Sequence, residues 1–240
     1  MSAAPLLSVQ GLVAKRARRT VVCGVDLDVQ PGDRIYICGQ NGCGKSTFLE
    51  ALLGLIPSYA TRYEWLSRPG GPQQHKAFRT GLVTYLPQHR NLFPSLTLRA
   101  NILLGSLLER SESAARLTAL LGHIFEITPA LDKLPRNAST GERQLAAVLR
   151  TLMQRPDLLV LDEPTASVSA ATIPRLYAAI EYTLPSGSAV IYADQHRSVA
   201  EHFATRCFEM VSGLLVPMPT GGAQGAVATC TSLVTQGASQ

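Results

Sequence analysis

The fold of this chain is decided by residues 39 to 47, which read Gly39-Gln40-Asn41-Gly42-Cys43-Gly44-Lys45-Ser46-Thr47. The stretch fits the pattern G-x-x-x-x-G-K-[ST], in which glycines let the backbone curl so that successive N–H groups point inward at an anion. A helix that begins near Lys45 adds the positive end of its dipole, the Lys45 ammonium can reach the outer phosphates of a nucleotide, and the Ser46 hydroxyl suits Mg²⁺. The stretch therefore predicts a phosphate-binding loop made of Gly39, Asn41, Gly42, Cys43, Gly44, Lys45, Ser46 and Thr47.

The segments around this loop distinguish the prediction from a chance glycine-rich turn. Residues 34–38 form a short, mostly apolar run that is typical of a buried strand, and residues 45–55 read as a helix. Similar apolar runs recur at 81–86, 158–161 and 189–193. Purely apolar strands that are separated by helices indicate a parallel sheet covered on both faces.

Two acidic residues, Asp162 and Glu163, directly follow the apolar run 158–161. A parallel strand delivers its last residues to the carboxyl edge of the sheet, beside the phosphate-binding loop. There Asp162 can hold Mg²⁺, directly or through water, and Glu163 can polarise an attacking water as a general base. Taken alone, the pair reads equally well as surface acids that cap a loop, but a neighbouring phosphate-binding loop favours the functional interpretation.

The rest of the chain predicts one domain with two additions. Residues 6–27 alternate loosely between apolar and polar and favour a β-hairpin or meander. Residues 96–121 have helical periodicity, and the region from 91 to 150 reads as an inserted helical subdomain. Residues 217–240 carry no charge and are rich in Gly, Thr, Ser and Ala, so we expect a flexible tail after a domain that spans 1–216.

The composition excludes several classes of protein. The chain has 240 residues, 46% of them hydrophobic and 16% charged, so we expect an ordinary globular domain. Five cysteines without a C-x-x-C pair favour free thiols over a zinc site or a disulfide framework. The net charge of +5 comes with one basic cluster that has no aromatic interleaving, so nucleic acid is not the expected main partner. No run is long enough to span a bilayer and no signal peptide is apparent, so we expect a cytoplasmic chain.

With these residues in hand, the chain resembles the nucleotide-binding domains of ABC transporters over residues 6 to 216, with the motifs in family order. The resemblance implies a P-loop NTPase (RecA-like) core, in the α/β class, with an antiparallel β lobe and an inserted α-helical subdomain. Residues 91–98, Asn91-Leu92-Phe93-Pro94-Ser95-Leu96-Thr97-Leu98, are most similar to importer ATPases of the branched-chain amino acid type.

The same resemblance implies roles for residues outside the phosphate-binding loop. Gln88, in Leu86-Pro87-Gln88, looks like the Q-loop glutamine and would touch Mg²⁺ or the attacking water. Ser139 and Gly141 sit where the family has its L-S-G-G-Q signature and would meet ATP held by a second subunit, although alone they read as a simple helix N-cap. His196 looks like the switch histidine that contacts the γ-phosphate, although a single histidine is more often structural.

Three positions depart from the family pattern. Arg16 occupies the place of an aromatic residue that stacks on adenine, and a guanidinium can also stack on a purine. Ser169 replaces the aspartate of the D-loop. In the signature, Ala138 and Thr140 replace leucine and glycine, and Thr140 adds a side chain where the chain must approach a phosphate closely. These departures favour slow or asymmetric hydrolysis.

The resemblance thus implies an ATPase that uses ATP and Mg²⁺, closes head to tail with a second ABC ATPase subunit and drives a transmembrane permease from the cytoplasmic face of the membrane. Two alternatives stay open at this point. One is a soluble ABC ATPase that acts outside transport, and the other is a catalytically weak regulatory cassette in an asymmetric heterodimer.

Overall fold

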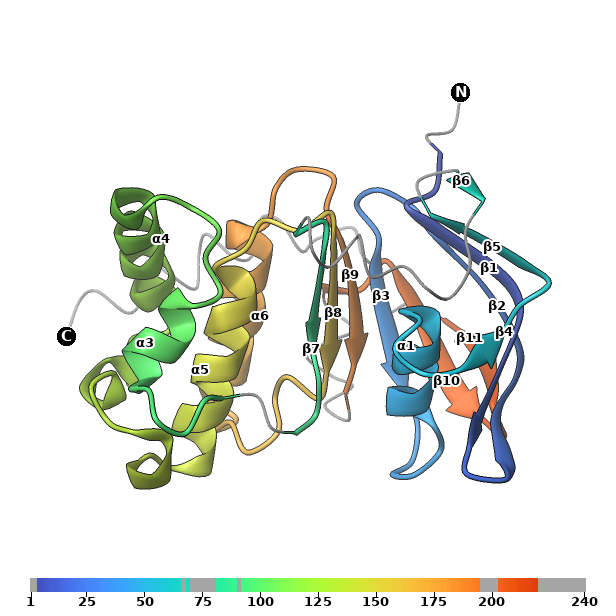
Figure 1. The fold of residues 1–240 in the computed structure, drawn as a ribbon, viewed down its shortest axis with the longest axis horizontal. Coiled ribbons are helices and arrows are strands. Elements are labelled where there is room, and N and C mark those ends of the chain that lie inside the picture. The colour runs from blue at the N-terminus through green and yellow to red at the C-terminus, as the bar shows by residue number, and fades with distance from the viewer. Residues whose placement is uncertain (1–3, 66–67, 70–80, 90–91, 195–202, 220–240) are drawn as a thin grey trace.

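The computed structural model describes residues 4–65, 68–69, 81–89, 92–194 and 203–219. In this part of the chain, two sheets and a layer of helices are stacked side by side (Figure 1). No described helix has the length and apolar character that crossing a bilayer requires. The mixed α/β architecture is the P-loop fold class expected from residues 39 to 47.

The central sheet carries the predicted parallel strands. In chain order its described strands are β3 (Arg34–Cys38), β7 (Val83–Leu86), β8 (Leu158–Asp162), β9 (Ala189–Ala193), β10 (Arg206–Val211) and β11 (Leu214–Met218). They lie in the order β11-β10-β3-β9-β8-β7, and only β11 runs antiparallel to its neighbour. Every residue of β8 and β9 is buried, which explains why these strands are apolar throughout.

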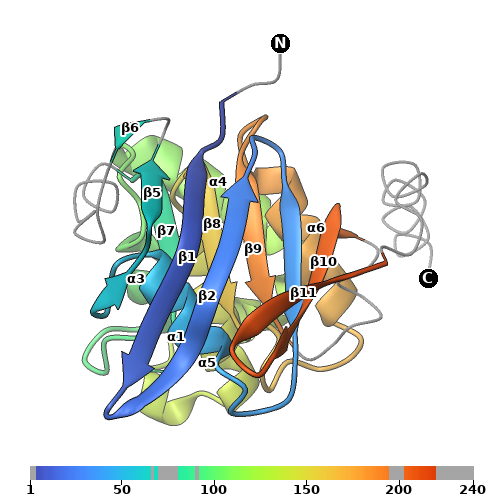
Figure 2. The same ribbon diagram turned by 90° about the vertical axis from the view of Figure 1, so that its right-hand side faces the viewer.

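The second sheet is the predicted antiparallel lobe. Its strands are β1 (Leu7–Arg16), β2 (Arg19–Val29), β4 (Ser58–Tyr59), β5 (Arg62–Trp65) and β6 (Arg68–Pro69). The long β1–β2 hairpin lies across the central sheet (Figure 2). Helix α1 (Lys45–Leu52) lies between the two sheets, and its apolar side chains join one hydrophobic core with both of them.

The helices cover the other face of the central sheet and share a second core with it. They are α3 (Leu98–Leu103), α4 (Arg110–His123), α5 (Thr140–Leu152) and α6 (Ile173–Thr183), with short 3₁₀ helices η1 (Phe125–Ala130) and η2 (Pro135–Asn137). Residues 96–121, where the sequence has helical periodicity, form α3 and α4 with a break between them. Gly105 lies in that break and passes so close to α5 that a Cβ there would lie 1.9 Å from the Arg150 carbonyl oxygen.

The first residues of the expected tail differ from the expectation. Pro217 and Met218 belong to β11 and pair with Phe208 and Cys207 of β10. Strand β11 therefore extends past residue 216, and residues 220–240 lie outside the described part. The composition of the segment did not indicate a strand, since proline is uncommon inside strands. Pro217 is accommodated because β11 is an edge strand, where a missing N–H donor is tolerated.

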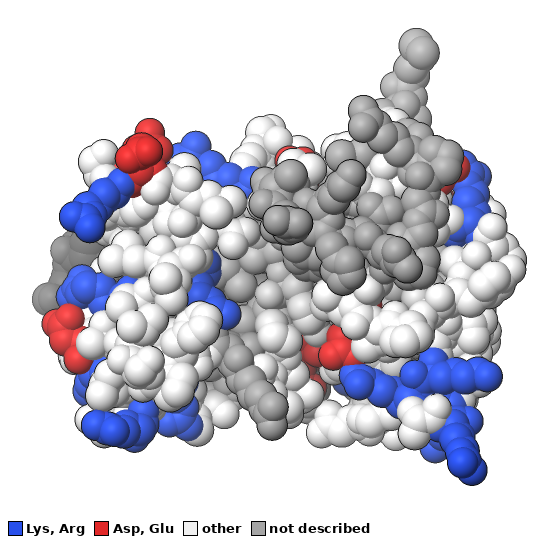
Figure 3. Space-filling view, in the orientation of Figure 1, with Lys and Arg blue, Asp and Glu red and all other residues white. Residues whose placement is uncertain are grey.

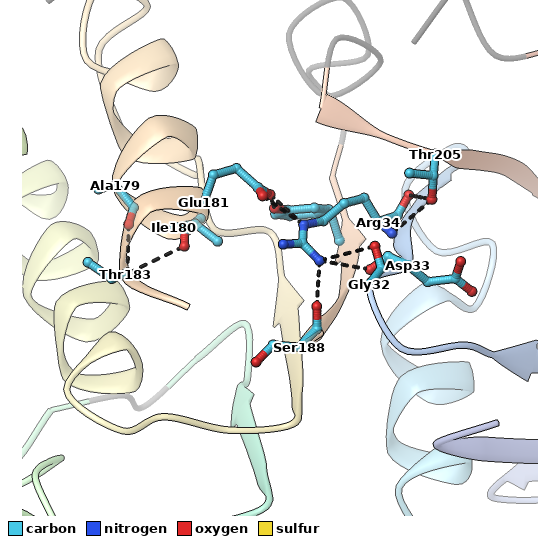
Figure 4. A network of polar contacts seen from close by, with 10 residues as sticks. Gly32, Asp33, Arg34, Ala179, Ile180, Glu181, Thr183, Ser188 and Thr205 are labelled. Atoms are coloured by element: carbon cyan, nitrogen blue, oxygen red, sulfur yellow. Dashed lines mark hydrogen bonds and ion pairs between the residues drawn. The ribbon is translucent and has the colours of Figure 1, made fainter. Parts of the chain in front are cut away.

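A polar network ties the end of the sheet opposite the phosphate-binding loop together (Figure 4). Arg34 at the start of β3 donates through Nε to both carboxylate oxygens of Glu181 on α6, at 2.7 and 2.8 Å, and through Nη1 to the Ser188 carbonyl oxygen at 2.6 Å. The Tyr192 hydroxyl of β9 donates to the same carboxylate at 3.0 Å. Burial lowers the pKa of Arg34, but the hydrogen bonds and charge of Glu181 outweigh it and leave the pKa raised.

Replacing Glu181 with glutamine is expected to destabilise the fold. The change leaves the largely buried Arg34 guanidinium without its counter-charge, which should lower the free energy of unfolding by about 2 kcal/mol. For a chain of this size that corresponds to a fall in Tm of roughly 4–8 °C, measured by circular dichroism. Glu64→Gln breaks the exposed pair between Arg62 and Glu64 and should leave Tm unchanged. Equal Tm values for Glu181→Gln and the unsubstituted chain would contradict this role.

Candidate nucleotide-binding site

The phosphate-binding loop connects the buried strand β3 to helix α1, as the sequence predicts. Gly39, Gly42 and Gly44 have φ values of 146°, 78° and 111°, in the region that glycine adopts readily. Gly44 is the N-cap of α1 and provides no side-chain hydrogen bond to the first turn. The backbone N–H groups at this helix end are therefore not satisfied by a side-chain cap, which suits them to an anion.

The Lys45 side chain lies within the loop and hydrogen-bonds to its backbone. Its ammonium donates to the carbonyl oxygens of Gly39 at 2.8 Å and Gln40 at 3.3 Å, and the residue is 5% exposed. A phosphate dianion is a stronger partner for the ammonium than these neutral carbonyl groups, because it adds the attraction between opposite charges. The geometry holds a positive charge at the floor of the loop, where it can turn to a nucleotide.

A cleft of about 380 Å³ opens above the loop and gathers most of the predicted residues. Its lining consists of Arg16, Val21, Asn41, Gly42, Gly44, Lys45, Ser46, Thr47, Gln88 and Glu163. Gly39 and Cys43 are not part of this lining, and a Cβ on Gly39 would come within 2.8 Å of the Cys43 Sγ. Residues from β1, β2, the loop, α1 and the turns after β7 and β8 thus meet at one point.

Arg16 stands at the rim of the cleft rather than free in solvent. Its guanidinium forms an ion pair with Glu50 and donates from Nε to the Thr47 hydroxyl at 3.4 Å. The neighbouring Lys15, Arg18 and Arg19 are exposed at the turn of the β1–β2 hairpin, where positive side chains gather on the surface (Figure 3). This rim gives the mouth of the cleft a positive character that suits a polyphosphate.

Asp162 lies at the end of β8, 1% exposed, and neither of its carboxylate oxygens makes a hydrogen bond of normal geometry among the described residues, although the Ser46 side chain lies close enough to lower its pKa. Burial raises the pKa of Asp162 to about 6, and the nearby Ser46 side chain and Lys45 charge only partly oppose that rise. A buried carboxylate without partners is costly in itself. Its position is explained better by a ligand than by the stability of the fold.

Asp162→Asn is therefore expected to stabilise the nucleotide-free chain at neutral pH. A pKa that rises on folding means that the folded chain binds more protons, so stability falls as pH rises from about 4 to 6 and stays low above it. The asparagine variant avoids that loss and should gain roughly 2 kcal/mol at pH 7.5 and nothing near pH 4. Thermal unfolding across this pH range measures the difference, and a lower Tm for Asp162→Asn at pH 7.5 would contradict it.

The residues at this point fit a magnesium ion. Mg²⁺ prefers hard oxygen ligands, usually one or two from the protein together with phosphate oxygens and water. The Ser46 hydroxyl and the unpartnered Asp162 carboxylate supply that set. Among the described residues, no group of three or more His, Cys, Asp or Glu side chains could hold a metal without the nucleotide.

Glu163 is held in an unusual conformation next to Asp162. Its φ of 52° is rare for a residue with a side chain and marks a strained turn. The Glu163 N–H donates to the Ala193 carbonyl oxygen at 2.7 Å, and the Glu163 carbonyl oxygen accepts from Gln144 at 3.0 Å. The side chain accepts a hydrogen bond from Gln88 Nε2 at 2.8 Å. Several elements therefore converge to aim this carboxylate into the cleft.

The signature-like residues lie apart from the cleft of their own chain. Ser139 is the N-cap of α5 and forms a capping box with Glu142, in which each side chain accepts from the other residue's N–H. A Cβ on Gly141 would lie 2.8 Å from the Ser167 carbonyl oxygen, so close packing requires glycine there. Neither residue lines the cleft around Lys45.

Two further expectations concern positions away from this geometry. His196 lies outside the described residues. Ser169, the departure from the D-loop pattern, shares a hydrogen bond of 2.8 Å with the Thr172 hydroxyl, which in turn donates to Glu126 at 3.4 Å. A neutral side chain fits this position, because a carboxylate there would face the Glu126 carboxylate.

Several residues of the site were not predicted from the sequence. Val21 of β2 lines the cleft, Glu50 of α1 pairs with Arg16, and Gln144 of α5 holds the turn at Glu163. Glu50 lies four residues after Ser46, so helical spacing alone would have put both on one face of α1. Val21 and Gln144 carry no comparable signal, because only the tertiary fold brings them to the cleft.

Comparisons with known proteins agree with this geometry. A family model described as ABC transporter matches residues 22–166, more than half of the chain. A putative ABC transporter ATP-binding protein of Streptomyces avermitilis is 30% identical over 223 residues, which cover 90% of this chain and 38% of the relative. The high-affinity branched-chain amino acid transport ATP-binding protein BraG of Pseudomonas aeruginosa is 29% identical over 205 residues, which cover 83% and 86%.

The lengths and the solved structures complete the comparison. The chain spans well under two thirds of the Streptomyces relative and most of the Pseudomonas one. A dimeric ATP-binding cassette, solved in a post-hydrolysis state bound to ADP and Pi, matches with a TM-score of 0.76 at 19% identity, over 90% of this chain and 99% of that one. This likeness shows the fold, and together with the family match over residues 22–166 it leads to one conclusion: the chain belongs to the ABC transporter family of ATP-binding proteins.

Proposed function

We propose that this chain binds ATP with Mg²⁺ in the cleft around Lys45 and hydrolyses it as the motor subunit of a transporter. The observation that carries the proposal is the convergence of Lys45, Ser46, Asp162, Glu163 and Gln88 at one point. The loop glycines and the end of α1 would bind the β- and γ-phosphates. Arg16, at the rim, would contact the base or sugar.

Each catalytic residue has a role that its contacts support. Ser46 and Asp162 would hold Mg²⁺, which offsets the negative charge of the phosphates when it is bound. Glu163 would accept a proton from the attacking water, since its carboxylate is held in the cleft by a strained turn. Gln88, bonded to Glu163, would orient that water or contact the metal. His196 remains the proposed contact to the γ-phosphate.

The proposed mechanism requires a second subunit. Ser139 and Gly141 stand apart from the cleft of their own chain, yet the end of α5 that they form is suited to a phosphate. In a head-to-tail dimer they would meet ATP held by the partner, as the resemblance implies, and a solved relative of this fold is dimeric. Loss of the γ-phosphate contacts would then open the dimer.

Coupling to a membrane protein is part of the same proposal. BraG is named as a transport ATP-binding protein, so we propose that this chain also works with a transmembrane permease. It would then lie on the cytoplasmic face of the membrane, with residues 1–216 as one ATP-binding domain and 91–150 as its helical subdomain. Affinity purification from detergent-solubilised membranes tests this, and recovery without any membrane protein would favour an ATPase outside transport.

The altered D-loop favours one alternative, a cassette with little turnover in an asymmetric heterodimer. Ser169 is engaged with Thr172 and offers no charge to a partner subunit. Release of phosphate from Mg²⁺-ATP by the purified chain, alone and in its complex, decides between the two functions. Turnover that depends on Glu163 supports the motor, whereas binding without turnover supports the regulatory cassette.

A further inference from the structure

An unusual group of buried oxygens lies beside the proposed metal site. Six buried side-chain polar atoms in the described residues have no hydrogen-bond partner, and three of them are the Tyr85 hydroxyl and the two oxygens of Asp162. The others, on Trp65, Glu126 and Tyr177, are separate from this group in the sequence. Buried polar groups normally find partners, so a concentration of such atoms at one place needs an explanation.

The register of the sheet brings Tyr85 to Asp162. Tyr85 of β7 pairs with Val160 of the parallel strand β8, so the two side chains point to the same face. Asp162 is two residues further along β8 and points to that face as well. The Tyr85 ring packs against the core that α1 shares with the sheet, the same side on which α1 presents Ser46.

The charged groups near the Tyr85 hydroxyl agree with the position that the register gives it. Burial is the main cause that raises the pKa of Tyr85, and the carboxylates of Asp162 and Glu50 raise it further while Arg16 opposes them. A phenol hydroxyl is a hydrogen-bond donor. The Asp162 carboxylate lies close enough to contribute a hydrogen bond to that rise, yet the hydroxyl makes no hydrogen bond of normal geometry within the described chain.

We propose that Tyr85 is a positioning residue for magnesium, whose hydroxyl donates to the Asp162 carboxylate or to a water of the metal once Mg²⁺-nucleotide is bound. The proposal rests on the proposed function, because it assigns the metal to Ser46 and Asp162. Partners of this kind fix the orientation of a ligating carboxylate and contribute to the affinity for the metal. A role in packing alone would need only the ring and not the hydroxyl.

Tyr85→Phe separates these two roles, because it keeps the ring and removes the oxygen. The measurement is the affinity of the purified chain for ATP, by calorimetry, first with EDTA and then with saturating Mg²⁺. We expect the gain in affinity that Mg²⁺ provides to fall by about tenfold in Tyr85→Phe, with the Mg²⁺-free affinity unchanged. Its Tm without nucleotide should equal or exceed that of the unsubstituted chain, since a buried unpartnered hydroxyl is removed.

A matched control is Tyr177→Phe. It removes another buried, unpartnered phenol oxygen, but from α6, whose side chain packs in the core on the other face of the sheet. This variant should keep the full effect of Mg²⁺. An unchanged Mg²⁺ effect in Tyr85→Phe, or an equal loss in Tyr177→Phe, overturns the proposal.

Asp162→Asn distinguishes failure of this inference from failure of the proposed function. If the unsubstituted chain binds Mg²⁺-ATP, Asp162→Asn loses the Mg²⁺ effect and Tyr85→Phe keeps it, only the role of Tyr85 is wrong. If Mg²⁺ makes no difference to the unsubstituted chain, or Asp162→Asn retains its effect, the metal assignment of the proposed function is wrong and this inference is wrong with it.

Discussion

Lys45→Ala is expected to weaken ATP binding by at least about 100-fold and to leave no measurable hydrolysis. Charge-assisted hydrogen bonds to a phosphate contribute about 1.5–3 kcal/mol each, and Lys45 is the cation at the floor of the loop. Among the described residues, the other lysine or arginine that lines the cleft is Arg16, which is engaged with Glu50 at the rim. Calorimetric titration with Mg²⁺-ATP measures the loss.

The control for this variant must show that the loop still folds. In the structure Lys45 donates to the carbonyl oxygens of Gly39 and Gln40, so its removal also frees two acceptors of the loop. The circular dichroism spectrum and Tm should show a folded chain. Lys133→Ala makes the same change of charge at a half-buried position away from the cleft, where the ammonium pairs with Glu142, and should bind ATP normally.

The outcome for Lys45 decides the whole functional assignment. An affinity equal to that of the unsubstituted chain would mean that ATP binds elsewhere, or that the loop does not grip its phosphates. A loss of affinity in both Lys45→Ala and Lys133→Ala would point to a general effect of positive charge. Only a selective loss at Lys45 agrees with a phosphate-binding loop.

The parts of the fold that the sequence predicts are those where local pattern and tertiary role agree. Strand β3 has the bounds expected for it, and β8 continues one residue beyond its apolar run to include Asp162. Most residues of these strands are apolar because both faces of each strand are buried. A short run of apolar residues in the sequence therefore indicates such a strand. The loop between β3 and α1 could also be predicted from the sequence, because its backbone conformation requires glycine.

The features that could not be predicted are those that depend on packing between elements far apart in the sequence. The helical periodicity after residue 96 does not indicate where α3 ends, or that Gly105 passes close to the Arg150 carbonyl oxygen of α5. The partners of Glu163 depend on tertiary structure in the same way, since Gln144 and Ala193 approach it from elements far away in the sequence. Motif order could locate Glu163, but it gave no indication of the strained turn that aims it.

Glu163→Gln is expected to lower the rate of ATP hydrolysis by about 1,000-fold while ATP binding is retained. General base catalysis contributes factors of 10² to 10⁴, and an amide does not accept a proton from water at neutral pH. Glutamine keeps the size of the side chain, and its amide oxygen can still accept the hydrogen bond from Gln88. Phosphate release under saturating Mg²⁺-ATP measures the rate, and Glu209→Gln, an exposed change of the same kind on β10, should leave it unaltered.

The affinity for ATP distinguishes this variant from one that merely damages the cleft. The Glu163 charge contributes to the raised pKa of Asp162, so its removal favours the ionised form of the carboxylate that would hold Mg²⁺. It also removes a negative charge that repels the γ-phosphate. Glu163→Gln should therefore bind Mg²⁺-ATP as tightly as the unsubstituted chain or more tightly, in contrast to Lys45→Ala. Unchanged turnover would assign the base to another residue, and a parallel loss of binding and turnover would make Glu163 a binding residue instead of the base.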